Sequence, residues 1–108
     1  MPAATYTPER RKHPRVTLDT EVWIGQDGVF THTPQRLSNL GLGGAFLEVD
    51  AGFAMGSILN LRFPIESAFV TATVIVRSVR LGQGIGVEFL DLSPESRDVL
   101  EAFMAGSI

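Results

Sequence analysis

The sequence contains no cysteine, which excludes disulfide bonds, thiolate catalysis and cysteine-ligated metal sites. It has only two histidines, His13 and His32, so a histidine-rich metal site is excluded and a Ser-His-Asp triad is not expected. No apolar run reaches the ~20 residues that a membrane-spanning helix needs, and the N-terminus lacks an apolar signal core. We therefore expect a soluble cytoplasmic protein that is not an enzyme and uses neither a metal nor a cofactor.

What remains is enough for one small domain. The chain has 108 residues, of which 44% are apolar, and a domain of this size buries roughly two-thirds of the surface of its unfolded chain. The first residues are poor in bulky apolar side chains and contain two prolines. We expect residues 1–8 to be a loose lead-in and residues 9–108 to form a single domain.

The charge is unevenly distributed. The chain has 9 basic and 12 acidic residues, and four of the nine basic residues lie within residues 10–15. The rest of the chain therefore carries 9 − 4 = 5 bases against 12 acids, a balance of −7. A nucleic-acid-binding domain usually has a broad basic surface, so no nucleic-acid partner is expected. A compact anionic ligand with phosphate groups suits a short basic segment better, and the alternative is a solvated tail.

Alternating apolar and polar residues predict strands joined by short turns. Asp27-Gly28 is a hairpin signal, Pro64 is expected to end one strand, and residues 39–44 and 82–84 are glycine-rich breaks. The predicted strands cover residues 16–24, 29–37, 45–49, 57–63, 69–80 and 85–89. Six short strands predict an all-β fold, a small antiparallel barrel or closed sandwich.

A single helix is predicted after the last strand. Ser93 is a helix cap and Pro94 suits the first helical position. Val99, Leu100 and Phe103 form an apolar stripe at helical spacing, and Gly106 ends the helix. This helix is expected to cover an open side or end of the barrel, or to pack on a second copy, so the chain is either a monomer or a homodimer.

Two residue clusters suggest a binding site. Arg11 and Arg15 form an R-x-x-x-R spacing just before the first strand, and arginine forks bind phosphate or the N7/O6 edge of guanine. Asn39 begins the second cluster, in which Gly41, Gly43 and Gly44 let the backbone approach a ligand and tolerate a positive φ. An asparagine side chain offers both a carbonyl and an amide to a base edge. Either cluster alone also fits an ordinary loop.

Together these clusters resemble the PilZ domain, a bacterial receptor module for cyclic di-GMP. Its signatures are R-x-x-x-R and, further along the chain, [D/N]-x-S-x-x-G, here Arg11-x-x-x-Arg15 and Asn39-x-Gly41-x-x-Gly44. Glu9-Arg10-Arg11, the late strand Gly84-Ile85-Gly86-Val87-Glu88-Phe89 and the terminal helix extend the likeness over nearly the whole chain. The resemblance implies a six-stranded split barrel with a C-terminal helix.

The resemblance also implies the residues of a cyclic di-GMP site. Arg11 and Arg15, with Arg10 beside them, match the arginines that hold phosphate and guanine. Asn39 matches the residue that reads a guanine edge, and Gly44 matches the glycine that the ligand approaches. Gly41 departs from the pattern because the family prefers serine there. A second frame over residues 36–41 supplies Ser38 and Gly41 but puts Arg36 where Asp or Asn belongs.

The implied function is reception of cyclic di-GMP, with ligand binding ordering the N-terminal arginine arm and signalling to an unidentified partner protein. The missing hydroxyl at Gly41 keeps a second possibility open, an adaptor that does not bind the messenger and acts through protein contacts. A nucleic-acid or anionic-membrane binder acting through residues 10–15 is a third. The arginines of the predicted strands are expected to be mostly solvated, although one could reach the ligand from a neighbouring strand, and the sequence does not say which. They are Arg36, Arg62, Arg77 and Arg80.

Overall fold

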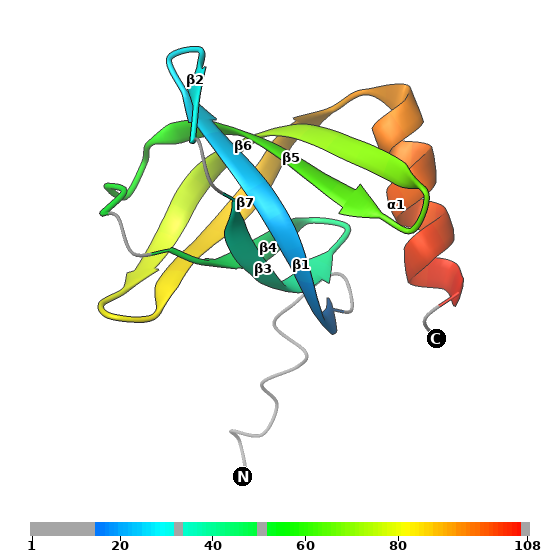
Figure 1. Cartoon of the computed structure of the whole chain (residues 1–108), viewed down its shortest axis with the longest axis horizontal. Coiled ribbons are helices and arrows are strands. Elements are labelled where there is room, and N and C mark those ends of the chain that lie inside the picture. The colour runs from blue at the N-terminus through cyan, green and yellow to red at the C-terminus, as the bar shows by residue number, and fades with distance from the viewer. Residues whose placement is uncertain (1–14, 32–33, 50–51, 107–108) are drawn as a thin grey trace, which may run out of the picture.

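The computed structural model describes residues 15–31, 34–49 and 52–106, and its strands form one antiparallel sheet. The sheet order is β2-β1-β3-β4-β7-β6-β5, and β1 also pairs with β5, which closes the sheet into a barrel (Figure 1). The predicted six-stranded antiparallel barrel with a C-terminal helix is confirmed, and β2 adds only two residues. The elements are β1 (Arg15–Gln26), β2 (Val29–Phe30), β3 (Gln35–Gly41), β4 (Gly44–Glu48), β5 (Ile58–Ile65), β6 (Ala68–Arg80), β7 (Gly84–Leu92) and α1 (Pro94–Gly106).

The first hairpin follows the sequence closely. Val22 and Ile24 of β1 are buried while Asp19 and Glu21 are exposed, as the alternation predicts. Asp27 and Gly28 both adopt positive φ, 55° and 83°, which is the conformation of a two-residue type I′ turn. The Asp-Gly prediction is therefore confirmed.

The predicted strand over residues 29–37 is divided between two elements, and the predicted glycine-rich break over residues 39–44 is confirmed only at residues 42–43. The structure instead has the short β2 and a separate β3, and Asn39 and Gly41 belong to β3. The register of β3 against β4 shifts between Leu37 and Asn39. This bulge lets Leu37 and Leu40, three residues apart, both be fully buried. An extra residue in a strand interrupts the period of two, so the alternation in sequence no longer marks the strand.

Pro64 does not end its strand, contrary to the prediction. β5 continues to Ile65, and Pro64 pairs with Phe69 of β6 one step from the turn. Antiparallel pairs alternate between hydrogen-bonded and non-hydrogen-bonded positions. The second pair from a two-residue turn does not require an N–H, so a proline is tolerated there.

The barrel interior holds most of the core. The fully buried side chains come from every strand except β2, and α1 adds Leu100 and Met104. The core consists of Val22, Ile24, Leu37, Leu40, Ala45, Leu47, Leu59, Leu61, Phe63, Ile65, Val70, Ala72, Val74, Val76, Ile85, Val87, Leu100 and Met104. The strand faces that point away from this core are therefore free to carry a surface site.

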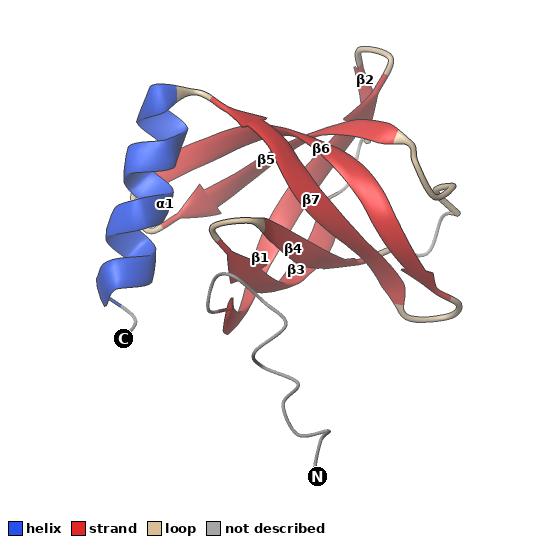
Figure 2. Cartoon of the chain, turned by 180° about the vertical axis from the view of Figure 1, so that it is seen from behind, coloured by secondary structure: helices blue, strands red, loops and turns tan. Residues whose placement is uncertain are grey.

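Helix α1 lies against the barrel, mainly on β6 (Figure 2). The Ser96 amide donates to Ser93 Oγ at 3.1 Å, which confirms the predicted cap. Ser96 is itself buried, and its Oγ accepts a hydrogen bond from the Thr71 amide of β6 at 3.0 Å. The expectation that the helix covers the barrel is thus confirmed. Over the described ranges, no helix is long and apolar enough to cross a membrane.

The far end of β1 carries the only tryptophan of the chain. Trp23 is half-buried and pairs with Arg62 of β5. The Arg62 guanidinium lies 4.3 Å from the centre of the Phe69 ring. Trp23, Arg62 and Phe69 line a shallow hollow together with Phe30.

Candidate functional site

The structure brings Arg15 next to Asn39, although 24 residues separate them in sequence. In the antiparallel pairing of β1 with β3, Arg15 lies opposite Gly41 and Thr17 lies opposite Asn39. Arg15 and Thr17 share a face of β1, so Arg15 and Asn39 are diagonal neighbours. Arg15 Nη1 donates to Asn39 Oδ1 at 3.4 Å. One residue from each sequence cluster therefore meets on the outer face of the barrel.

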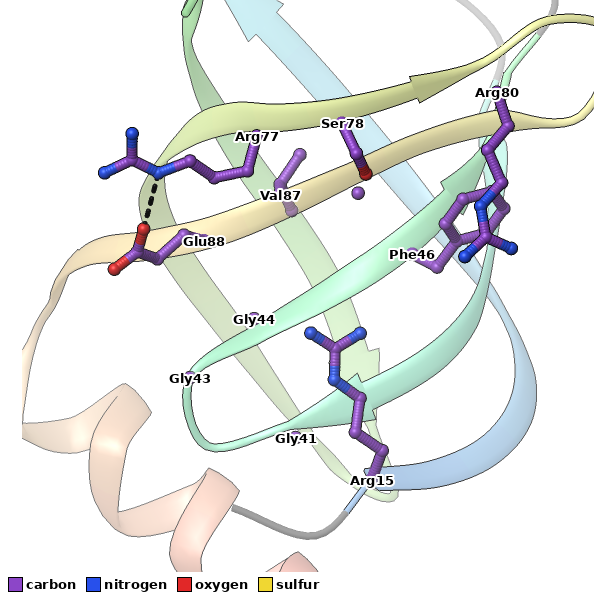
Figure 3. A pocket seen from close by; sticks show the side chains of 11 residues that line it. Arg15, Gly41, Gly43, Gly44, Phe46, Arg77, Ser78, Arg80, Val87 and Glu88 are labelled. Atoms are coloured by element: carbon purple, nitrogen blue, oxygen red, sulfur yellow. Dashed lines mark hydrogen bonds and ion pairs between the residues drawn. The ribbon is translucent and has the colours of Figure 1, made fainter. Parts of the chain in front are cut away.

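A pocket of about 360 Å³ opens beside this pair (Figure 3). Its residues come from the beginning of β1, the end of β3, and the neighbouring strands β4, β7 and β6. They are Arg15, Gly41, Gly43, Gly44, Phe46, Arg77, Ser78, Arg80, Gly86, Val87 and Glu88. The predicted residues Arg15, Gly41 and Gly44 thus share one pocket, and Asn39 is tied to it through Arg15.

The glycines of this site serve close approach and not a left-handed backbone. Among the described glycines, a positive φ occurs at Gly28, Gly56, Gly82 and Gly84, and at none of residues 41, 43 and 44. A Cβ on Gly44 would lie 2.2 Å from the Val87 carbonyl oxygen. Gly44 is therefore required by its contact with β7. The expected use of positive φ in residues 41–44 does not hold.

Two pocket arginines could not be distinguished from the other strand arginines in the sequence. Arg77 and Arg80 line the pocket from β6, whereas Arg62 lies over Phe69 and Arg36 binds Asp19. The sequence left open which strand arginine would be in reach, and the structure places two of them at the pocket. The only signal in the sequence is that β6 turns from apolar to polar at Arg77-Ser78.

Phe46 and Ser78 also line the pocket without having been singled out. Phe46 pairs with Gly86, and Gly86 pairs with Ser78, so the three form a row across β4, β7 and β6. The middle member has no side chain, which leaves the row hollow between Phe46 and Ser78. A Cβ on Gly86 would lie 2.5 Å from Ser78 Oγ.

The pocket carries an excess of positive charge. Its lining has three arginines, Arg15, Arg77 and Arg80, and one acid, Glu88, a balance of 3 − 1 = +2. Arg77 Nε donates to Glu88 Oε1 at 2.7 Å. The Arg77 side chain is 60% exposed and the Glu88 side chain is 50% exposed. Arginine forks are the side chains best suited to bind phosphate oxygens in pairs. The pocket is therefore suited to an anion in an otherwise acidic protein.

The second possible motif frame does not lead to the pocket. Arg36 Nε donates to Asp19 Oδ1 at 2.8 Å, and a second nitrogen of Arg36 contacts the same oxygen. The hydrogen bond to Asp19, together with its charge, raises the pKa of Arg36. Arg36 is thus held on the outer surface of the sheet by its own acid. The geometry favours the frame that begins at Asn39.

Two predicted site residues cannot be placed. Arg10 and Arg11 lie outside the described residues, which begin at Arg15. Of the six predicted ligand residues, the structure therefore locates four, and these four are Arg15, Asn39, Gly41 and Gly44.

Comparisons with known proteins agree with this architecture. The model of the PilZ domain family matches residues 9–106. No curated protein matches the sequence. Solved structures with the same fold include the Bacillus subtilis inhibitor of motility MotI/DgrA (TM-score 0.78, 15% identity, covering 91% of this chain and 51% of that chain). The chain therefore spans about half the length of MotI/DgrA.

Two further structures are similar. One is the PilZ domain of CeSA from a cellulose synthesizing bacterium (TM-score 0.64, 15% identity, covering 87% of this chain and 97% of that chain). The other is the Borreliella burgdorferi PlzA protein in complex with c-di-GMP (TM-score 0.63, 17% identity, covering 87% of this chain and 40% of that chain). At these identities the likeness establishes the fold.

Proposed function

Because this chain belongs to the PilZ domain family, we propose that it is a receptor for cyclic di-GMP. The observation that carries the proposal is the Arg15–Asn39 pair beside a cationic pocket lined by Gly41 and Gly44. Both sequence signatures of the family contribute to this one place on the barrel. The PlzA protein, which shares the fold, was solved in complex with c-di-GMP.

The chemistry of the pocket fits a guanine dinucleotide. Two phosphates match the excess of guanidinium groups, since each guanidinium can form paired, charge-assisted hydrogen bonds. The N7 and O6 atoms of guanine are acceptors that an arginine fork also fits. Arg15 on β1 and Arg80 on β6 reach the pocket from strands on either side of β4, the strand that begins at Gly44 (Figure 3). A planar base can therefore lie close to the backbone at Gly44 while arginines bind its edge or its phosphates.

The glycine at position 41 weakens this site without removing it. The hydroxyl that the family pattern supplies would contribute one neutral hydrogen bond, worth about 0.5–1.5 kcal/mol. Its loss lowers affinity by roughly tenfold at most. The Arg15 and Asn39 contacts are retained, and a water molecule can take the place of the missing hydroxyl.

The N-terminal arginine arm, residues 10–15, suggests how ligand binding could be passed on as a signal. Arg11 lies four residues before Arg15, so its Cα is within about 14 Å of that of Arg15, close enough for its side chain to reach a ligand in the pocket. A ligand held by both the arm and the barrel would order the arm, and this would change the surface offered to a partner protein. Hydrogen exchange tests this step. Amide protection near residues 8–15 should rise on saturation with cyclic di-GMP, and unchanged protection would refute the ordering.

Calorimetric titration of the whole chain with cyclic di-GMP tests the proposal itself. We expect saturable binding of cyclic di-GMP. Neither GMP nor ATP at equal concentration should displace the bound cyclic dinucleotide. Absence of binding at millimolar ligand would refute the receptor function. The departure at Gly41 would then favour the second candidate, an adaptor that acts through protein contacts alone.

A further inference from the structure

We propose that Glu88 selects guanine at this site by accepting hydrogen bonds from the base. This inference rests on the proposed function and names a specificity residue outside both sequence signatures. Glu88 lies directly opposite Gly44 in the pairing of β4 with β7. A base that approaches the backbone at Gly44 is therefore flanked by the Glu88 side chain.

Guanine needs an acceptor in the pocket. Its N1–H and N2–H₂ groups are neighbouring donors on one edge, and a carboxylate can accept from both at once. Asn39 is not among the residues that line the pocket, and its side chain has one acceptor oxygen, whereas a carboxylate has two and can pair with both donors. Among the described residues that line the pocket, Glu88 is the only carboxylate.

Arg77 holds this carboxylate in position. Its Nε donates to Glu88 Oε1 at 2.7 Å, and the pair lies at the edge of the pocket near Gly44 (Figure 3). A carboxylate has about four lone-pair sites, so one bond from Arg77 leaves capacity for a base. Arg77 is a positioning residue, since it acts on the base through Glu88.

The same carboxylate disfavours adenine. Adenine has an acceptor at N1, where guanine has a donor, so a carboxylate facing this edge meets a lone pair. Two acceptors that face each other repel and form no hydrogen bond, so the adenine edge gains nothing from Glu88. Glu88 should therefore discriminate between cyclic di-GMP and cyclic di-AMP, which carry the same two phosphates.

The test measures dissociation constants of both cyclic dinucleotides for the wild type, Glu88→Gln and Glu88→Asp. Loss of an acidic charge should strengthen binding of both anions equally, so the informative quantity is the ratio of the two constants. Glu88→Gln is expected to lower the preference for cyclic di-GMP on the order of tenfold. Glu88→Asp keeps the charge but shortens the reach, and it should lower the preference in the same direction.

Glu101→Gln is the matched control, because it removes one acidic charge from an exposed position on α1 and should leave the preference unchanged. The inference is overturned if the wild type binds cyclic di-GMP and neither Glu88 variant changes the ratio by more than threefold. If the wild type binds neither dinucleotide, the proposed function is refuted, and the inference, which rests on it, is refuted as well. The two failures are therefore distinct.

Discussion

The guanidinium of Arg80 lies 5.2 Å from the centre of the Phe46 ring, although these residues are on strands that do not pair with each other. β7 runs between them, and the residues it places opposite Arg80 and Phe46 are Gly84 and Gly86. Because neither has a side chain, the arginine can reach across β7 to the ring. The result is a flat cationic surface at one side of the pocket.

Arg80→Ala should weaken cyclic di-GMP binding by about tenfold, since it removes one charge-assisted hydrogen-bond donor and part of the stacking surface. Calorimetry measures the effect, and Arg97→Ala on the exposed face of α1 is the control for general charge. Equal affinities of Arg80→Ala and the wild type would remove Arg80 from the site.

Arg15→Ala should have a larger effect, at least tenfold, because the substitution removes the donor that joins the pocket to Asn39. Arg36→Ala provides the comparison on the neighbouring strand, since Arg36 is engaged with Asp19 and does not line the pocket. If both variants bind as the wild type does, the ligand lies elsewhere on the protein.

Gly41→Ser should keep the affinity or raise it by up to tenfold, because it restores the hydroxyl of the family pattern. Gly41 is not among the described residues with positive φ, so serine introduces no left-handed strain. The titration is the same as for the wild type. A clear loss of affinity would mean that the ligand occupies the space a side chain needs at this position.

Gly44→Ala should destabilise the fold itself. The new Cβ would lie 2.2 Å from the Val87 carbonyl oxygen, so β4 and β7 must separate. Such overpacking typically costs about 1–3 kcal/mol, which lowers the melting temperature by roughly 4–8 °C per kcal/mol. Gly52→Ala is the control, because nothing lies within 4 Å of its Cβ position. Thermal unfolding with equal midpoints for the two variants would contradict this packing.

Local signals in the sequence were sufficient for the hairpin at Asp27-Gly28, the cap at Ser93 and the long strand β6. Each of these depends on residues that are close together in the chain. The bulge after Leu37 is different, because it is set by the pairing of β3 with β4. It moved Asn39 from a predicted loop onto a strand, and no local pattern marks it.

The pocket could be predicted only in part for the same reason. Arg15, Asn39, Gly41 and Gly44 belong to motifs, so the sequence could identify them. Arg77, Arg80 and Phe46 become neighbours through the order β4-β7-β6, which depends on how the barrel closes. Glu88 occupies an exposed position of β7, and its place opposite Gly44 emerges only from the register of β4 against β7.

The position of Trp23 has a practical consequence. It lies eight residues after Arg15 on the same strand, which corresponds to about 26 Å. Intrinsic fluorescence, which comes mainly from this single indole, is thus a remote reporter and not a contact probe for the pocket. If the emission spectrum shifts during titration with cyclic di-GMP, ligand binding changes the surroundings of Trp23 at the far end of β1. If the spectrum does not change, the barrel stays rigid at that end when the ligand binds.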